Sequence, residues 1–311
     1  MNLVLLGLVI GNTLINATPI LYAGLGGMIS EKSGVTNIGL EGMMTIGALI
    51  AATVGYYTHN PWLAFLCGGL SGMVFALIHA VVSIRFAGDQ TISAIAINYL
   101  GPGVALFVSR IFFDGATQTK PIEPQFKIPV LFDGIQNKFL ANVISLPATV
   151  YLVFVLVCLI YIFMYKTKWG MRLIAVGEHP KAAETLNINV FFVRYMAVLF
   201  SGFMAGLGGA TMSISLVSSF FPALVAGQGF IALVTVIFGK WTPQGVMLAA
   251  LFFGFAQSIS VVLGGTNLPI PSELISMIPY VATLVVLILF GGKTKAPTAD
   301  GIPYLKDDIA I

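Results

Sequence analysis

Long apolar stretches separated by short polar segments run along almost the whole chain. A helix needs about 20 mostly apolar residues to cross a bilayer, and charged side chains mark where such stretches end. By this rule the predicted spans are residues 3–28, 42–57, 62–84, 90–113, 146–165, 192–213, 223–239, 243–263 and 273–291. The sequence therefore predicts about nine membrane-crossing helices.

The two longest uncharged stretches, residues 42–84 and 195–239, are each too long for a single crossing. Turn-like sequences divide them, THNP at residues 58–61 and SSFFP at residues 218–222. Only helices and closed barrels satisfy the backbone within lipid, and these continuous runs lack the alternation of a barrel. We therefore expect an all-α fold, a polytopic transmembrane helical bundle.

Composition excludes several classes of protein. Hydrophobic residues make up 58% of the 311 residues and charged residues only 9%, with a mean hydropathy of +0.96, whereas a soluble domain carries about 25% charged residues. A soluble enzyme and a disordered chain are thereby excluded. A net charge of +3 offers no basic patch for nucleic acid. Cys67 and Cys158 lie in apolar runs and are expected to be packed thiols.

Basic residues predict the orientation, because loops rich in lysine and arginine stay in the cytoplasm. The loop 166–194 holds five of the fifteen basic residues, whereas the loop 114–145 balances three lysines against three acidic residues. We expect one transmembrane domain over residues 1–292, with loop 166–194 and the tail 293–311 in the cytoplasm and loop 114–145 outside. The first apolar stretch lacks a basic start and a cleavage site, so we expect a retained span.

A five-residue pattern, Ala-Gly-Leu-Gly-Gly, occurs at residues 23–27 and again at residues 205–209. Two interpretations stay open. Small residues recur wherever membrane helices pack closely, or a unit has been duplicated on either side of the fifth span. An odd number of intervening crossings would make such repeats inverted, an arrangement common in transporters.

A polar, glycine-spaced segment at residues 30–42 interrupts the first apolar region. One interpretation is a simple cytoplasmic turn that exposes Glu31 and Lys32. The other is a broken, re-entrant element near residues 30–41 that lines a solute route, because irregular backbone at membrane depth requires surrounding protein or a water-filled cavity. Asn37 and Glu41 are its candidate residues, and Glu41 would begin the next helix, where the helix dipole favours an anion.

A second polar stripe begins the fourth predicted span. Gln90, Ser93 and Asn98 share roughly one helical face, which indicates that they face the bundle interior. They either join helices by hydrogen bonds or contact a solute, and Gln90 and Asn98 are the candidates for solute contact. Gln228 and Gln257 leave the same two choices. No acidic residue lies in the middle of the later spans, which argues against an ion-coupled carrier.

No residue pattern indicates catalysis. The sequence GKT at residues 292–294 imitates the end of a phosphate-binding loop, but Leu287 stands where that loop needs a glycine. The three histidines lack metal-ligand or triad spacing. We expect no catalytic residue, metal site or cofactor in this chain.

Three motifs carry a family resemblance. The sequence RLIAVGEHPKAAE at residues 172–184 resembles the cytoplasmic coupling loop of permease subunits from bacterial ABC importers of the branched-chain amino acid/ribose group. The blocks SGVTNIGLEGMM at residues 33–44 and GATQT at residues 115–119 are most similar to the nucleoside branch. The resemblance implies that block 33–44 lines the central route. It also implies that the helix coupled to the ATPase contains Gly177, Glu178, Pro180, Ala182 and Ala183.

The same resemblance implies an importer of the bacterial plasma membrane, with this chain forming half of a route for nucleosides. Its partners would be a second, different permease chain, cytoplasmic ATPase subunits that hold ATP and Mg²⁺, and a lipid-anchored extracellular substrate-binding protein. The alternatives are the same machine for ribose or another simple sugar, an ion-coupled carrier acting alone, and a structural membrane protein. The polar pair Glu31-Lys32 departs from the sugar permeases and argues against a sugar.

Overall fold

The computed structural model describes residues 3–265, 271, 274–275, 277–290 and 295–306. Parts of the predicted span 273–291 and of the predicted tail 293–311 lie outside the described residues. The long helices are α1 (Leu3–Lys32), α2 (Leu40–Thr58), α3 (Pro61–Ala80), α4 (Gln90–Phe112), α6 (Ala148–Lys166), α9 (Val190–Ala210), α11 (Pro243–Gly264) and α13 (Ile278–Phe290).

Shorter elements connect these helices. They are η1 (Val81–Arg85), η2 (Pro124–Phe126), α5 (Lys138–Ile144), α7 (Lys168–Glu178), α8 (Pro180–Thr185), η3 (Thr211–Val217) and α10 (Gln228–Phe238). Two-residue strands, β1 (Val130–Leu131) and β2 (Leu146–Pro147), pair in antiparallel fashion with Val130 opposite Pro147. This pairing ties both ends of the segment that contains α5.

The structure confirms a polytopic helical bundle, and each predicted span contains a helix. Among the described residues, six helices are long and apolar enough to cross a membrane: α1, α3 with η1, α4, α6, α9 with η3, and α11. The helix α10 has only 11 residues, and α2 and α13 also do not meet this criterion. The expected number of nine crossings therefore stays a prediction.

Capping side chains explain where several helices begin. Asn60 accepts hydrogen bonds from two backbone N–H groups in the first turn of α3, each at 3.1 Å, at the break that residues 58–61 predict. Asp89 and Asn189 cap α4 and α9 in the same way, at 2.8 and 3.0 Å. These bonds satisfy donors that the first helical turn leaves without an intrahelical partner.

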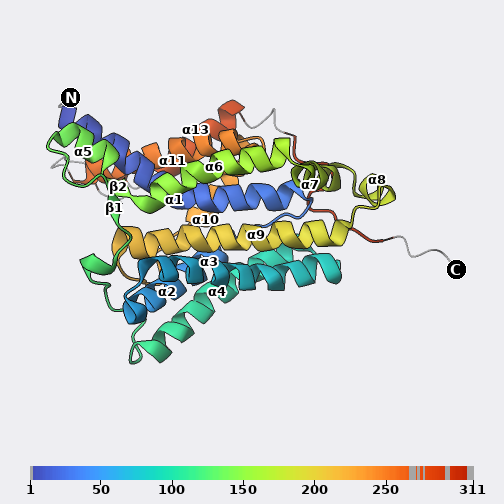
Figure 1. Ribbon diagram of the computed structural model, residues 1–311, viewed down its shortest axis with the longest axis horizontal. Coiled ribbons are helices and arrows are strands. Elements are labelled where there is room, and N and C mark those ends of the chain that lie inside the picture. Colours follow the sequence, from blue (N-terminus) through green and yellow to red (C-terminus); the bar gives the residue numbers. More distant parts are fainter. Residues whose placement is uncertain (1–2, 266–270, 272–273, 276, 291–294, 307–311) are drawn as a thin grey trace.

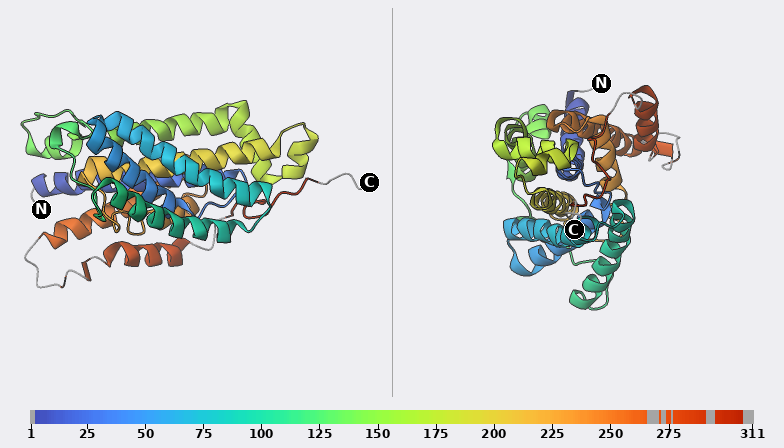
Figure 2. Two further views of the ribbon diagram at one scale, coloured as in Figure 1. Left: turned by 90° about the horizontal axis from the view of Figure 1, so that it is seen from below. Right: turned by 90° about the vertical axis from the view of Figure 1, so that its right-hand side faces the viewer.

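Two long helices that run in opposite directions, α1 and α9, form the centre of the bundle (Figure 1). The helix α9 packs against α1, α2 and α3, whereas α1 packs against α9, α10 and α11. Seen end-on in Figure 2, α9 lies near the middle, with α3 and α4 below it and α11 and α13 above it. Each central helix therefore packs largely on helices from the other half of the chain.

Both copies of the repeated Ala-Gly-Leu-Gly-Gly pattern lie in this centre. In α9, a Cβ on Gly209 would clash with the Met44 carbonyl oxygen of α2. In α1, a Cβ on Gly24 would lie 2.6 Å from Thr235 Oγ1 of α10. Glycine at these positions allows the helix backbones to approach closely.

The two ends of the bundle carry different segments. The N-terminal end of α1 lies with α5, β1 and β2, whereas α7, α8 and the described tail lie at the opposite end (Figure 1). The loops 114–145 and 166–194 are therefore on opposite ends, as alternating crossings require.

Candidate translocation and coupling sites

Residues 33–39 form an irregular turn between α1 and α2, at the polar segment that the sequence marks as a break. A simple exposed turn would place Glu31 in water, but only 5% of its surface is exposed. Its carboxylate accepts a hydrogen bond from Trp241 Nε1–H, on the connection between α10 and α11. The interpretation as a simple exposed turn is therefore wrong at Glu31.

Two side chains of α4 hold this turn in place. Gln90 Oε1 accepts the Thr36 backbone N–H at 2.8 Å. Asn98 donates from Nδ2 to the Ile38 carbonyl oxygen at 3.0 Å and accepts the Gly42 backbone N–H at 2.9 Å. Asn98 thus caps α2 from a neighbouring helix, because the N–H groups in a first turn have no intrahelical acceptor.

Asn37 joins the turn to α9. Its side chain is fully buried, and Nδ2 donates to Ser201 Oγ at 2.9 Å. Its Oδ1 accepts the Gly39 backbone N–H at 3.1 Å. The amide therefore has protein partners on both its oxygen and its nitrogen.

Glu41 lies in the first turn of α2, as the sequence predicts, but its carboxylate caps a different helix. Its two oxygens accept the backbone N–H groups of Gly227 and Gly229, both at 2.7 Å, where α10 begins. The free N–H groups and the dipole of a helix N-terminus stabilise such an anion. A Cβ on Gly229 would clash with the Glu41 backbone, so glycine permits this close approach.

His79 is a buried residue of this region that the sequence did not single out. Its ring nitrogens lie 3.0 Å from Ser93 Oγ and 3.1 Å from the Thr36 carbonyl oxygen. It therefore joins α3 to α4 and to the turn. The only signal in the sequence was a histidine within an apolar span. Its partners could not be predicted, because they lie 14 and 43 residues away along the chain.

The predicted coupling segment forms two short helices, α7 and α8, which meet at His179. Of the five residues assigned to coupling by resemblance, Gly177 and Ala183 are buried, Glu178 and Pro180 are half-buried, and Ala182 is exposed. A Cβ on Gly177 would clash with the Lys32 carbonyl oxygen, so α7 packs directly on the end of α1. The buried members thus position the pair of helices, and Ala182 lies on its outer surface.

The described tail, residues 295–306, lies along these helices. The Ala299 N–H donates to the Gly177 carbonyl oxygen at 2.9 Å. Thr298 Oγ1 donates to Glu178 Oε2, also at 2.9 Å. The tail is therefore hydrogen-bonded to the last two residues of α7, Gly177 and Glu178.

The same tail reaches the turn between α1 and α2. Asp300 Oδ1 accepts a hydrogen bond from Thr36 Oγ1 at 2.9 Å, and Arg194 Nη1 donates to the Ile302 carbonyl oxygen at 3.1 Å. Burial raises the pKa of Asp300 to about 6, while the Thr36 bond, the Gly301 N–H and the positive charge of Arg194 oppose that rise. The tail thus connects α7, α9 and the turn.

Comparison with known proteins identifies the family. Residues 9–289 match the branched-chain amino acid transport system / permease component family. The chain belongs to this permease family. The match confirms the resemblance seen in the sequence motifs. Because a permease component carries solutes and does not convert them, this permease is not itself an enzyme.

Individual relatives align with almost the whole permease. It is 40% identical to the guanosine ABC transporter permease protein NupQ of Bacillus subtilis, over 97% of this chain and 98% of the relative. It is 39% identical to the nucleoside ABC transporter permease protein NupC of Lactococcus lactis, with the same coverage. The putative glucose ABC transporter permease protein TsgC13 of Haloferax volcanii is 34% identical over 87% of this chain and 88% of its own length.

All four candidate residues for solute contact border one region of the permease, where α2 and α10 begin inside the bundle. Each of them bonds to other parts of the protein, and Gln228 and Gln257 bond to each other at 3.2 Å, so polar side chains do join helices here. Solute contact stays a prediction. Gln90 is distinct because its buried Nε2 has no hydrogen-bond partner among the described residues. A buried unpaired donor costs about 1–3 kcal/mol, so Gln90 is the one of the four candidates with an unused hydrogen-bond donor in this conformation.

Proposed function

We propose that this chain is the transmembrane permease subunit of a bacterial ABC importer for nucleosides. The observation that carries the proposal is the identity of 39–40%, over 97% of the chain, to two relatives whose names give guanosine and nucleosides as their solutes. The glucose permease relative, at 34% identity, favours a simple sugar as the second candidate.

The proposed route passes the region where α2 and α10 begin. In this proposal the chain crosses the membrane nine times, and α2 and α10 are corresponding helices of two inverted repeats, the first containing α1 and the second α9. The opposite directions of α1 and α9 and their reciprocal packing support this proposal. Helices that start within a bundle direct N–H groups toward its interior, which suits the polar groups of a solute.

Asn37, Glu41, Gln90 and Asn98 are the proposed route residues. Because all four hold backbone groups of the breaks, their proposed role is to shape the route and to offer polar atoms when those hydrogen bonds rearrange. Gln90 is the best candidate for direct contact, since its Nε2 can donate without losing a bond to the described residues.

The end with α7, α8 and the tail is proposed to be cytoplasmic, and loop 114–145 extracellular. The five basic residues in loop 166–194 support this orientation. In the proposed assembly, ATPase subunits holding ATP and Mg²⁺ contact α7 and α8, a second permease chain of different sequence completes the route, and a lipid-anchored substrate-binding protein delivers the solute outside.

Coupling is proposed to pass from α7 and α8 to the turn 33–39 by two connections. One is the direct packing of Gly177 on the end of α1. The other is the tail, which bonds to both Gly177 and Thr36. A movement of α7 imposed by the ATPase would therefore move the turn that borders the route.

Uptake of radiolabelled nucleoside tests the proposed function. A strain without other nucleoside carriers is compared with and without this gene, and unlabelled nucleosides or ribose compete. We expect deletion to abolish uptake, the restored gene to recover it, and nucleosides alone to compete. Unchanged nucleoside uptake after deletion would refute the nucleoside assignment, and competition by ribose would favour the sugar permease.

A further inference from the structure

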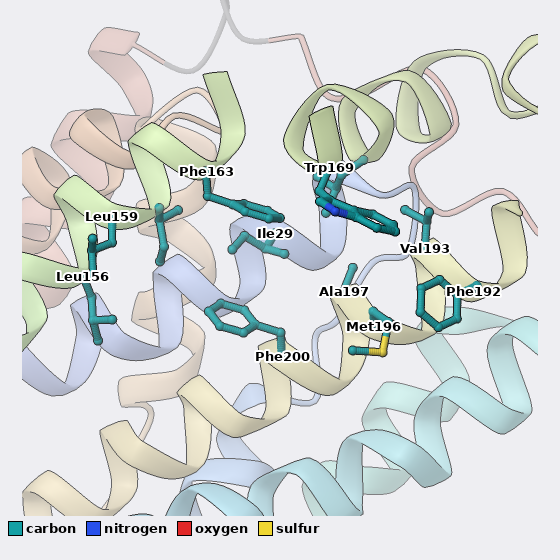
Figure 3. Close-up of a pocket in the computed structure, with 12 residues that line it drawn as sticks. Ile29, Leu156, Leu159, Phe163, Trp169, Phe192, Val193, Met196, Ala197 and Phe200 are labelled. Atoms are coloured by element: carbon teal, nitrogen blue, oxygen red, sulfur yellow. The ribbon is translucent and has the colours of Figure 1, made fainter. Parts of the chain in front are cut away.

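An apolar groove lies on the outside of the bundle between α1, α6, α7 and α9. Its volume is about 510 Å³. Figure 3 shows Leu159 and Phe163 of α6 opposite Met196 and Phe200 of α9, with Trp169 of α7 toward one end. The groove is separate from the turn 33–39 and from the proposed route residues, none of which line it.

The groove is open toward the surroundings of the bundle. Leu159, Trp169, Phe192 and Met196 line it, and between 50% and 55% of the surface of each is exposed. Apolar side chains exposed in this way on a membrane protein contact either acyl chains or another apolar surface. The groove therefore needs an apolar occupant.

The junction of α6 and α7 beside the groove is basic, because Lys166, Lys168 and Arg172 are all exposed there. The acidic residues of α1 and α7 already have protein partners: Glu31 is buried and accepts a hydrogen bond from Trp241, and Glu178 accepts one from Thr298. The Arg172 guanidinium lies 5.1 Å from the centre of the Trp169 ring, which itself lines the groove. A positive charge thus lies directly at the end of the groove formed by Trp169.

We propose that this groove binds an anionic phospholipid, with an acyl chain between α6 and α9 and the phosphate at Arg172, Lys166 and Lys168. An apolar slot that ends at a tryptophan and a basic cluster matches the order of groups along a lipid: acyl chain, interface and phosphate. A helix from another protein would fill the slot but would leave the basic cluster without an anion. The charge therefore favours the lipid.

Lipid retained by the purified full-length transporter complex tests the basic end of the site. The complex is equilibrated with vesicles of phosphatidylcholine and phosphatidylglycerol, purified in mild detergent, and its bound lipids are counted by mass spectrometry. Arg172→Glu is expected to weaken retention of phosphatidylglycerol roughly tenfold, the order that a reversed charge near an anionic headgroup gives. Arg85→Glu is the matched control, because Arg85 is also an exposed arginine but lies outside the groove.

Blocking the groove tests its apolar part. Ala197→Phe fills the space between α6 and α9, and Leu159→Trp does so from a more exposed position if the first variant does not fold. Either variant is expected to lose phosphatidylglycerol while the complex stays assembled. Equal lipid retention in Arg172→Glu, Arg85→Glu and the original protein would overturn the proposal.

Two further outcomes would also overturn it. If a groove variant released the second permease chain without losing lipid, the groove would be a protein interface. If excess inorganic phosphate displaced the retained phosphatidylglycerol as effectively as added phosphatidylglycerol does, the basic residues would be a site for free phosphate, and the acyl chain would contribute nothing to binding.

Discussion

At the scale of single residues, the polar side chains inside this bundle mostly serve helices other than their own. Glu41 belongs to α2 but caps α10, and Asn98 belongs to α4 but caps α2. Asn37 holds its own turn and α9 together. Since no water competes for hydrogen bonds in the hydrocarbon region, each irregular backbone segment must find its partners in neighbouring helices.

Gln90 offers the sharpest test of direct solute contact. Gln90→Leu removes both its acceptor for Thr36 and its unpaired donor, whereas Gln90→Glu keeps an acceptor and removes the donor. We expect both variants to lower nucleoside uptake per inserted molecule by about tenfold, the upper end of what a lost hydrogen bond costs. The measurement is nucleoside uptake in cells, divided by the amount of each permease variant found in the membrane.

A control and a contrary result are available for Gln90. Gln125→Leu changes an exposed glutamine of η2 in loop 114–145 and should leave uptake unchanged. If Gln90→Glu transported as well as the original protein and only Gln90→Leu failed, Gln90 would be a support for the turn and not a solute contact.

At the scale of elements, the packing of two helix starts against each other decides where α10 lies. The start of α10 approaches the start of α2 so closely that a side chain on Gly229 does not fit. The Glu41 carboxylate then closes this contact by accepting two N–H groups. The position of α10 therefore depends on one glycine and one carboxylate.

Gly229→Ala is expected to destabilise the protein by about 1–3 kcal/mol, because the added Cβ overpacks the contact with α2. Gly103→Ala is the matched control, since a Cβ at Gly103 in α4 has no neighbour within 4 Å. The control should be neutral or slightly stabilising, because alanine favours a helix. Thermal unfolding in detergent measures both variants, and equal melting temperatures would contradict the close packing at Gly229.

At the scale of the whole molecule, the tail joins segments that are far apart in the sequence. Thr36 and Asp300 are separated by 264 residues, and Glu178 and Thr298 by 120. Tyr304 also donates a hydrogen bond to Glu184 of α8. The tail, residues 295–306, thus bonds both to the proposed coupling segment and to the turn beside the proposed route.

Removal of residues 295–311 is expected to weaken coupling between ATP hydrolysis and uptake in the assembled transporter. The expected result is a severalfold lower uptake per ATP hydrolysed, because α7 then moves the turn only through its packing on α1. Asp300→Ala, which removes the bond to Thr36, should give a smaller change in the same direction. Reconstituted vesicles in which both rates are measured provide the ratio.

The matched control is a chain shortened only after Lys306, which keeps every tail contact described above. It should couple like the full chain. An unchanged ratio of uptake to hydrolysis in the chain lacking residues 295–311 would show that the tail plays no part in coupling.

The sequence by itself determined the helical class, the approximate positions of the apolar helices and the family. Apolar length and the cost of an unsatisfied backbone in lipid leave a helical bundle as the answer. The turn sequence at residues 58–61 also marked the start of α3, where Asn60 accepts N–H groups of the first helical turn. The proposed coupling loop resembles the family's loop in the sequence alone because its motif lies within thirteen consecutive residues, 172–184.

The tertiary structure alone decided what those polar residues bond to. Nothing in the sequence pairs Glu41 with Gly229, His79 with Thr36, or Asp300 with Thr36, because these partners meet only when helices pack. The same reason explains why Glu31 is buried, although the polar segment 30–42 that contains it allowed the interpretation of an exposed turn. Periodicity and composition act along the chain, whereas burial and hydrogen bonding depend on which helices become neighbours.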